Sequence, residues 1–425
     1  MKQASQPEEF GAFIGIDWAD QKHFVSLCAA GQTAAEQYEL AQQPEVIAQW
    51  LSSLQQRFPG QRLAVALEQS RGPLIYALMN YEFLVLFPVN PKGLAKYREA
   101  FCVSGAKDDP VDAELLRELV TLHRDKLRAW RPDDELTRTI TLLVEYRRDL
   151  VDRRTGLTNQ LGSLLKLYYP QALEWAGELA TIQACDFLER WPTLEKVQAT
   201  TADELRQFYH AHGCRKAELI DQRLRQIANA QPLTRDGAVI TASCSMVQAV
   251  ISQLPPVLSA IKRMDQQIAE LFAQHTDQQL FSSLPGAGAV LAPRLLASCG
   301  ADRTRFSSAQ ELQQFSGIAP VIERSGKTCF VHRRFACPKF VRQSFHEYAA
   351  QSIRWSPWAR AYYQQQRQRG QKHHAAVRSL AFRWIRIIFH CWQARQTYSE
   401  EFYQQALRKR GSGLASLLMA SESAR

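Results

Sequence analysis

The sequence lacks the features that mark several specialised classes of protein. No stretch approaches the roughly 18 consecutive apolar residues of a membrane-spanning helix, and the N-terminus, MKQASQPEEFGAF, lacks the apolar core of a signal peptide. The nine cysteines stand singly, which argues against a disulfide framework and for reduced thiols. With 425 residues, of which 46% are hydrophobic, the chain is expected to form two or three globular domains in the cytoplasm.

Acidic residues are scarce in one segment, although they are common elsewhere. Between residues 321 and 395 there are 15 Lys and Arg against two acids, Glu323 and Glu347, and the whole chain carries a net charge of +10. A basic surface with stacking groups suits a polyanion, most simply nucleic acid, and the alternative is a basic helical domain that keeps some aromatics in its core. The aromatic residues interleaved with the basic ones are Phe335, Tyr348, Trp355, Trp358, Tyr362, Tyr363 and Trp384.

Short apolar runs alternate with helical periodicity between residues 12 and 90. The runs AFIGIDWA, HFVSLCAA, RLAVALEQ and EFLVLFPVN read as strands, the second as the hairpin partner of the first. The last two runs are continuously apolar and are separated by a helical stretch, RGPLIYALMNY, which favours parallel pairing in an α/β sheet. PKGLAKYREAF and PVDAELLRELVTLH are then expected to be helices. Residues 1–128 are therefore predicted to form an α/β domain.

A heptad pattern begins after about residue 131 and predicts two arms of an antiparallel coiled coil, with Pro255 and Pro256 starting or kinking the second arm. We expect a helical linker and oligomerisation region over residues 129–278, with short helices at 171–240. A mostly helical domain should follow over 279–408, and a disordered tail over 409–425. The heptad rows are Leu143, Leu150, Leu157 and Leu164 in the first arm, and Leu254, Ile261 and Ile268 with Val257, Met264 and Leu271 in the second.

Carboxylates crowd the stretch AKDDPVDAELL, residues 106–116, and like charges this close repel unless a cation lies against them. Asp109 and Asp112 share a helix face because they are three residues apart. Asp108 has no such partner and is left out of the candidate site. Asp17 and Glu68 each end a buried strand, and ligand sites of open α/β sheets lie at the carboxyl ends of strands.

These four acids come from three elements, and we expect them to converge on Mg²⁺, as two ions. Mg²⁺ takes oxygen ligands and leaves positions open for phosphate. Two such ions about 4 Å apart can activate a nucleophile and stabilise the leaving oxygen in phosphoryl transfer. The alternative is that each acid is an ordinary cap or turn residue, and Asp109-Pro110 is a good helix start by itself.

At these acids the sequence resembles a known family, the DEDD transposases of insertion sequences, which include Piv-type DNA invertases and bridge-RNA-guided recombinases. GIDWADQKHFV, VALEQSRG and KDDPVDAELL resemble the family's three acidic motifs. The resemblance implies that residues 1–128 form an RNase H-like (RuvC-like) catalytic domain. It also implies that Asp17, Glu68, Asp109 and Asp112 are its catalytic, metal-binding residues.

The C-terminal region begins with SLPGAGAVLAPRLLASCG, in which Leu-Pro-Gly-x-Gly joins two helical segments. A helix-hairpin-helix-like turn of this kind exposes backbone N–H groups that can hold a phosphate, and Gly286 and Gly288 would allow the close approach. A plain turn between two helices is the alternative. The resemblance extends here too, because the family's C-terminal transposase domain has a Pro-Gly-x-Gly motif, then Gly-x-x-Pro, then Ser-Gly.

The resemblance places the family's catalytic serine on Ser325 of RSGK, where it implies attack on DNA and a phosphoserine link to the DNA. Serine needs activation to act as a nucleophile, and nearby cations can neutralise the charge of a phosphate. A rival serine, Ser316 in FSGIAP, also precedes a glycine and reads equally as a helix-ending turn. The nearby basic residues expected to bind nucleic acid are Arg324, Lys327, Arg333 and Arg334.

The sequence therefore predicts a DNA transposase or site-specific recombinase that cuts and rejoins donor and target DNA. The resemblance further implies a structured guide RNA and a homo-oligomer, a dimer or tetramer, in which acids and serine come from different protomers. We expect the protein in the cytoplasm, at the nucleoid when bound to DNA, with no membrane partner. Two alternatives stay open: a RuvC-like Holliday-junction or structure-specific nuclease that uses water, and a non-catalytic nucleic-acid-binding protein.

Overall fold

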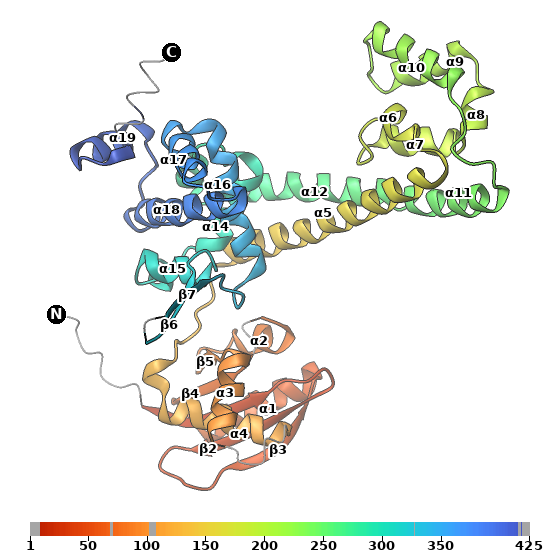
Figure 1. Ribbon diagram of the computed structural model, residues 1–425. Helices are drawn as coiled ribbons and strands as arrows, with labels where there is room; N and C mark the ends of the chain where they lie inside the picture. Colours follow the sequence, from red (N-terminus) through yellow and green to blue (C-terminus); the bar gives the residue numbers. More distant parts are fainter. Residues whose placement is uncertain (1–8, 69–70, 102–107, 327, 415–417, 419–425) are drawn as a thin grey trace. The chain divides into compact units, whose positions relative to one another are not determined.

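The computed structural model describes residues 9–68, 71–101, 108–326, 328–414 and 418 (Figure 1). The chain divides into two compact units, Met1–Pro132 and Asp133–Arg425, and each is described by itself. The division falls four residues after the expected boundary at residue 128. The second unit contains both the middle region and the C-terminal region.

The first unit is built on a five-stranded sheet with the order β3-β2-β1-β4-β5. β1, β2 and β3 pair antiparallel, whereas β1 pairs parallel with β4 and β4 with β5, so the predicted parallel pairing is confirmed. The edge strand β3 was not predicted, because only Leu40 of its six residues is buried and the apolar signal is weak. The strands are β1 (Phe10–Asp17), β2 (Lys22–Ala29), β3 (Glu36–Ala41), β4 (Arg62–Leu67) and β5 (Leu84–Pro88).

Helices cover both faces of this sheet, which gives the first unit a mixed α/β architecture. α1 (Pro44–Arg57) and α2 (Pro73–Leu78) pack on one face, in a core that includes Ile14 and Ile16 of β1. α3 (Pro91–Phe101) and α4 (Asp109–Leu122) pack on the other face, against alternate residues of the same strands. This alternation follows from the two-residue period of a strand.

α4 crosses β1 at Gly15, and only a glycine fits there. A Cβ atom at this position would lie 2.0 Å from the Ala113 carbonyl oxygen and 2.4 Å from the Arg117 backbone nitrogen. Beyond the C-terminal end of α4, the Arg124 guanidinium lies 5.0 Å from the ring centre of Phe10, the first residue of β1. α4 therefore runs opposite to β1, and its N-terminus lies at the carboxyl end of that strand.

The second unit begins with a long arm of two antiparallel helices, α5 (Glu135–Tyr168) and α12 (Leu254–Gln274) (Figure 1). The Thr137 hydroxyl lies 2.9 Å from His275 Nε2 at one end, and the Arg147 guanidinium pairs with Asp265 further along. The predicted helical hairpin is thus present. The helix α12 begins one residue before Pro255, as expected. The fully buried positions of α5, however, lie beside the leucine heptad row and not on it: they include Ile140, Val144, Leu161 and Leu165.

One segment, Gly237–Gln274, is long and apolar enough by length and composition to cross a membrane. It is interrupted, because α11 (Gly237–Ile251) ends before α12 begins, and both helices pack along α5. We interpret the segment as part of the arm, since its partner α5 is rich in charged residues.

The short helices predicted for residues 171–240 are present at the end of the arm, where they share a core of their own. Tyr169, Trp175 and Phe187 are fully buried in this core, together with Leu161 and Leu165 of α5. The helices are α6 (Ala172–Trp175), α7 (Ile182–Arg190), α8 (Leu194–Gln198), α9 (Ala202–Ala211) and α10 (Ala217–Asn229).

The C-terminal region is mostly helical and packs around a cluster of buried aromatic residues, Tyr348, Trp358 and Trp384. It also holds a β-hairpin, β6 (Val321–Ser325) and β7 (Thr328–His332), that was not predicted, because its strands are exposed and lack an apolar run. The helices are α13 (Gln278–Ser282), α14 (Gly288–Cys299), η2 (Arg303–Arg305), α15 (Ala309–Phe315), α16 (Lys339–Trp355), α17 (Pro357–Gln368), α18 (His373–Ala394) and α19 (Glu400–Lys409).

The prediction of a disordered tail over residues 409–425 is wrong in part. Leu414 and Leu418 are buried against the core of the C-terminal region. This short apolar pattern was overlooked because the tail as a whole is rich in small and polar residues.

Candidate active site

The first candidate site is the carboxyl edge of the sheet in the first unit, where β1 and β4 end side by side. Ile16 pairs with Leu67, so Asp17 and Glu68 occupy the next positions on adjacent parallel strands, which lie about 4.8 Å apart. Asp17 is two residues after Gly15 and therefore lies on the same face of β1, the face that contacts α4. Glu68 follows β4 with the same parity as Ala66, which belongs to the core on the α4 side. Both acids therefore leave the sheet on the side covered by α4.

The first turn of α4 brings Asp109 and Asp112 to the same edge. Asp108 is the N-cap residue and Pro110 fixes the start of the helix, which explains why the helix begins here. The antiparallel course of α4 over β1 places this turn at the carboxyl end of the strand. Asp109 is exposed, whereas Asp112 is only 1% exposed. The four predicted acids thus come to one edge of one sheet.

Arginines already neutralise part of the acidic stretch. Arg98 of α3 donates from Nε to Asp112 Oδ1 at 2.6 Å, and its Nη2 lies 2.5 Å from the same oxygen. Glu114 lies 3.6 Å from Arg117 on its own helix. The cation expected against this stretch is therefore supplied in part by the chain itself. Arg98 was missed from the sequence, although it stands in the helix directly before the acidic residues.

The donor set at this edge fits Mg²⁺ in kind, because all four candidate side chains are carboxylates, and hard oxygen donors are what Mg²⁺ prefers. Within the described parts of the chain, no three Asp, Glu, His or Cys side chains are grouped closely enough to hold a metal ion. The Arg98 contact gives a physical reason, since Asp112 is engaged by a guanidinium. A metal ion bound here would compete with Arg98 for this carboxylate.

We expect Arg98→Gln to lower thermal stability in the absence of divalent metal. The change leaves Asp112 buried without its partner, and breaking a buried ion pair in this way costs about 3–5 kcal/mol. Millimolar Mg²⁺ should restore more stability to this variant than to the wild type, because the ion replaces the lost positive charge. Thermal unfolding with MgCl₂, against NaCl at equal ionic strength, measures the difference. Lys96→Gln, an exposed change on the same helix, should show neither effect; equal Mg²⁺ stabilisation of all three proteins would contradict a metal site at Asp112.

A second candidate site, in the second unit, is the tip of the β6–β7 hairpin. Ser325 ends β6, pairs with Thr328 and is exposed. Ser316, the rival, is fully buried at the end of α15, where its hydroxyl donates to the Gln313 carbonyl at 3.1 Å. A buried, hydrogen-bonded serine cannot meet a DNA phosphate without local unfolding, so accessibility favours Ser325 as the nucleophile.

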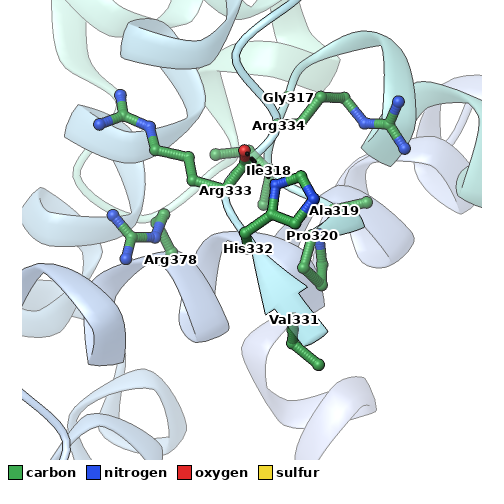
Figure 2. A pocket seen from close by; sticks show the side chains of 9 residues that line it. All are labelled: Gly317, Ile318, Ala319, Pro320, Val331, His332, Arg333, Arg334 and Arg378. Carbon is green, nitrogen blue, oxygen red and sulfur yellow. Dashed lines mark hydrogen bonds between the residues drawn. The ribbon is translucent and has the colours of Figure 1, made fainter. Parts of the chain in front are cut away.

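The predicted basic residues lie along this hairpin and after it. Arg324 is exposed on β6, and Lys327 lies outside the described residues. Arg333 and Arg334 follow β7 and line a cavity of about 170 Å³ at the base of the hairpin. Figure 2 shows Arg333 and Arg378, a residue of α18 that the sequence interpretation missed, on one side of His332 and Arg334 on the other.

The glycines of the Pro-Gly-x-Gly turn differ in their surroundings. Gly286 has φ +79°, and a Cβ atom there would lie 2.5 Å from Cδ1 of Trp355, so its close neighbour is a side chain of the same unit. This contact supports the interpretation as a plain turn between α13 and α14. Gly288 has φ +54° and open space where its Cβ would be. Phosphate binding at these two glycines stays a prediction.

The aromatic residues of the basic segment divide into core and surface. Tyr348, Trp358 and Trp384 are fully buried and Tyr362 nearly so, which makes them packing residues. Phe335 is 74% exposed and Trp355 is 65% exposed. These two residues remain available to stack on a base.

Comparison with known proteins gives matches that cover both candidate sites, the sheet edge and the hairpin tip. A family model described as "Transposase" matches residues 14–170, which include all four acids, and a second, described as "Transposase IS116/IS110/IS902 family", matches residues 278–364, which include Ser325.

Curated relatives match over much of the chain. The mini-circle putative transposase for IS117 of Streptomyces coelicolor is 32% identical over 399 residues, covering 92% of this chain and 95% of the relative. An uncharacterized 42 kDa protein of insertion element IS900 from Mycobacterium paratuberculosis is 26% identical over 294 residues, covering 67% of this chain and 70% of the relative. An uncharacterized 44.8 kDa protein of insertion element IS116 from Streptomyces clavuligerus is 28% identical over 67% of this chain and 70% of the relative. Matches of this extent at both ends of the chain identify it as a member of the IS110 family of DEDD transposases.

Proposed function

We propose that the protein cuts and rejoins DNA, using a carboxylate site for Mg²⁺ and Ser325 as a covalent nucleophile. The observation that carries the proposal is the meeting of Asp17, Glu68 and the first turn of α4 at one edge of the sheet. Acids at the tips of buried strands are costly to place there without a cation. Their gathering at a carboxyl edge is what a metal-dependent phosphoryl-transfer site requires.

The sheet itself supports a RuvC-like assignment for the first unit. Its order β3-β2-β1-β4-β5, with an antiparallel meander followed by two parallel strands, agrees with the RNase H-type fold that the family resemblance implies. In this assignment Asp17, Glu68, Asp109 and Asp112 would hold two Mg²⁺ ions. The ions would supply charge stabilisation at the phosphate and its leaving oxygen.

Ser325 gives the reaction a way to conserve the energy of the broken bond. Its oxygen bonds to phosphorus as the bond to one deoxyribose oxygen breaks; the serine proton is lost and the leaving oxygen is released as a hydroxyl. A hydroxyl of a second strand can then attack the phosphoserine, which regenerates Ser325 and joins the strands. The exposed position of Ser325, with arginines on the same hairpin, supports this role.

The partners we propose are donor DNA, target DNA and a structured guide RNA, in a homo-oligomeric complex. The basic segment 321–395 supports a polyanionic partner, and the exposed Phe335 and Trp355 add stacking groups. The family resemblance supports the guide RNA and an oligomer in which acids and serine of different protomers act together.

Reconstitution tests the proposal. The protein is purified with the nucleic acid that accompanies it, the RNA is sequenced, and labelled donor and target DNA are added with Mg²⁺. We expect joined DNA strands in Mg²⁺ and none in the presence of a chelator, without any nucleotide cofactor. Cleaved strands that are never joined would favour the water-using nuclease, and binding without any cleavage would favour a non-catalytic nucleic-acid-binding protein.

A further inference from the structure

The cavity at the base of the β6–β7 hairpin concentrates positive charge in a way that the proposed chemistry at Ser325 does not by itself explain. Residues 317–320 and Val331 line part of the cavity, and His332, Arg333, Arg334 and Arg378 supply the polar lining. Arg378 comes from α18, some 45 residues further along the chain, and Figure 2 shows its guanidinium on the same side of His332 as that of Arg333.

The arginines of this cavity carry positive charge that no described carboxylate balances. Within the part of the chain that the structure describes, no ion pair joins Arg333, Arg334 or Arg378 to a carboxylate. The nearby acid, Glu323, is taken by His332, whose Nε2 lies 2.9 Å from its Oε1. Burial, and then repulsion by Arg333 and Arg342, lower the pKa of Arg378. Like charges held close in a partly buried cavity raise the free energy of the folded protein unless an anion joins them.

We propose that this cavity binds a backbone phosphate of the DNA strand that reacts at Ser325, with Arg378 and Arg333 as its charged ligands. The inference rests on the proposed function, because it takes Ser325 as the reacting group. A phosphate suits the site because guanidinium groups match its oxygens in geometry and charge. Three of the nine lining residues are arginines and His332 is the one aromatic ring among them, so contact with the backbone is favoured over stacking on a base.

The hairpin sets the distance between this phosphate and the one that reacts. Ser325 pairs with Thr328 and Val321 pairs with His332, so these residues share one face of the hairpin, four positions apart. At about 3.3 Å per residue this is about 13 Å. A strand of duplex DNA rises about 3.4 Å per nucleotide, so the bound phosphate is expected on the order of four nucleotides from the reacting one.

A phosphate scan tests the position. Full-length protein carrying Ser325→Ala, with its accompanying RNA, is titrated with DNA duplexes that each contain one neutral methylphosphonate on the reacting strand. We expect roughly tenfold weaker binding at one or two positions within about four nucleotides of the reacting phosphate, the scale of one charged hydrogen bond. When Arg378→Gln is added to this variant, a methylphosphonate at these positions should weaken binding no more than one at the neighbouring positions.

A salt titration gives a second measure of the same contact. Loss of one phosphate contact should reduce the slope of log K against log salt by about 0.9 for duplex DNA in Arg378→Gln. Arg369→Gln removes the same charge from an exposed position of the basic segment outside the cavity. It should leave the position-specific pattern intact. Arg378→Gln should also melt at or above the wild-type temperature, because it relieves repulsion with Arg333.

Three results would overturn the inference. In the first, the Arg378→Gln variant keeps the wild-type pattern in the phosphate scan. In the second, the substitution weakens binding of the RNA and leaves binding of the DNA unchanged. In the third, the variant melts several degrees below the wild type, as expected for a residue whose role is packing. Because the scan uses Ser325→Ala and measures binding only, its outcome does not depend on whether Ser325 forms an adduct. The experiment can therefore reject phosphate binding in the cavity without rejecting the proposed function, and the reverse.

Discussion

Ser325→Ala is expected to abolish every covalent protein–DNA species and all strand joining, while binding of DNA is retained. The serine oxygen is the atom that bonds to phosphorus in the proposed reaction, and alanine has no replacement for it. Removing a catalytic nucleophile lowers turnover by on the order of 10³-fold or more. Labelled DNA on a denaturing gel measures the adduct, and peptide mapping of trapped material identifies the residue that carries it.

Ser316→Ala is the matched control, because it removes the same hydroxyl from the other Ser-Gly pair. Ser316 is buried and donates to Gln313, so this change should cost some stability, about 1 kcal/mol for one hydrogen bond, and leave the adduct in place. An adduct that maps to Ser316 would transfer the nucleophile to the rival residue. Efficient cleavage by the wild type with no adduct at any time would instead support hydrolysis by water.

Asp109→Ala is expected to abolish strand cleavage in Mg²⁺, by a factor comparable to loss of the nucleophile, while DNA binding is retained. Asp109 is exposed at the sheet edge where Asp17 and Glu68 end, and loss of a metal ligand removes the ion that stabilises charge at the phosphate. Cleavage rates in Mg²⁺, and in Mn²⁺ as a more tightly bound substitute, measure the loss.

Asp108→Ala removes the same charge from the neighbouring residue, which makes it a close control. Asp108 is the N-cap residue of α4, but its side chain makes no capping hydrogen bond, so we expect little effect on cleavage or stability. Equal loss of cleavage in both variants would point to the net charge of the stretch and not to a ligand at position 109. Wild-type cleavage by Asp109→Ala would remove this residue from the site.

Mixing the two inactive proteins extends both predictions. If acids and serine of different protomers share one site, a mixed oligomer of Asp109→Ala and Ser325→Ala contains one intact pair and should recover part of the activity. If each protomer supplies both parts of its own site, every site in the mixture lacks one part and no activity returns.

Features that follow from local periodicity could be predicted directly from the amino-acid sequence. The parallel pairing of β4 with β5, the hairpin of β1 with β2 and the long helices of the arm all produce repeating apolar patterns, which a single chain displays directly. Elements with a weak local apolar pattern were not predicted. The exposed strands β3, β6 and β7 bury few side chains, and Leu414 and Leu418 lie in an apolar stretch too short to predict a packed element.

Tertiary structure alone decided which charges meet and which serine is accessible. Asp112 and Arg98 pair across two helices, and Arg378 reaches the hairpin from α18; these contacts depend on the packing of elements that no local pattern relates. The contrast between Ser325 and Ser316 is of the same kind, because both precede a glycine and only burial separates them. Charge and accessibility are properties of neighbours in space, whereas a sequence displays only neighbours along the chain.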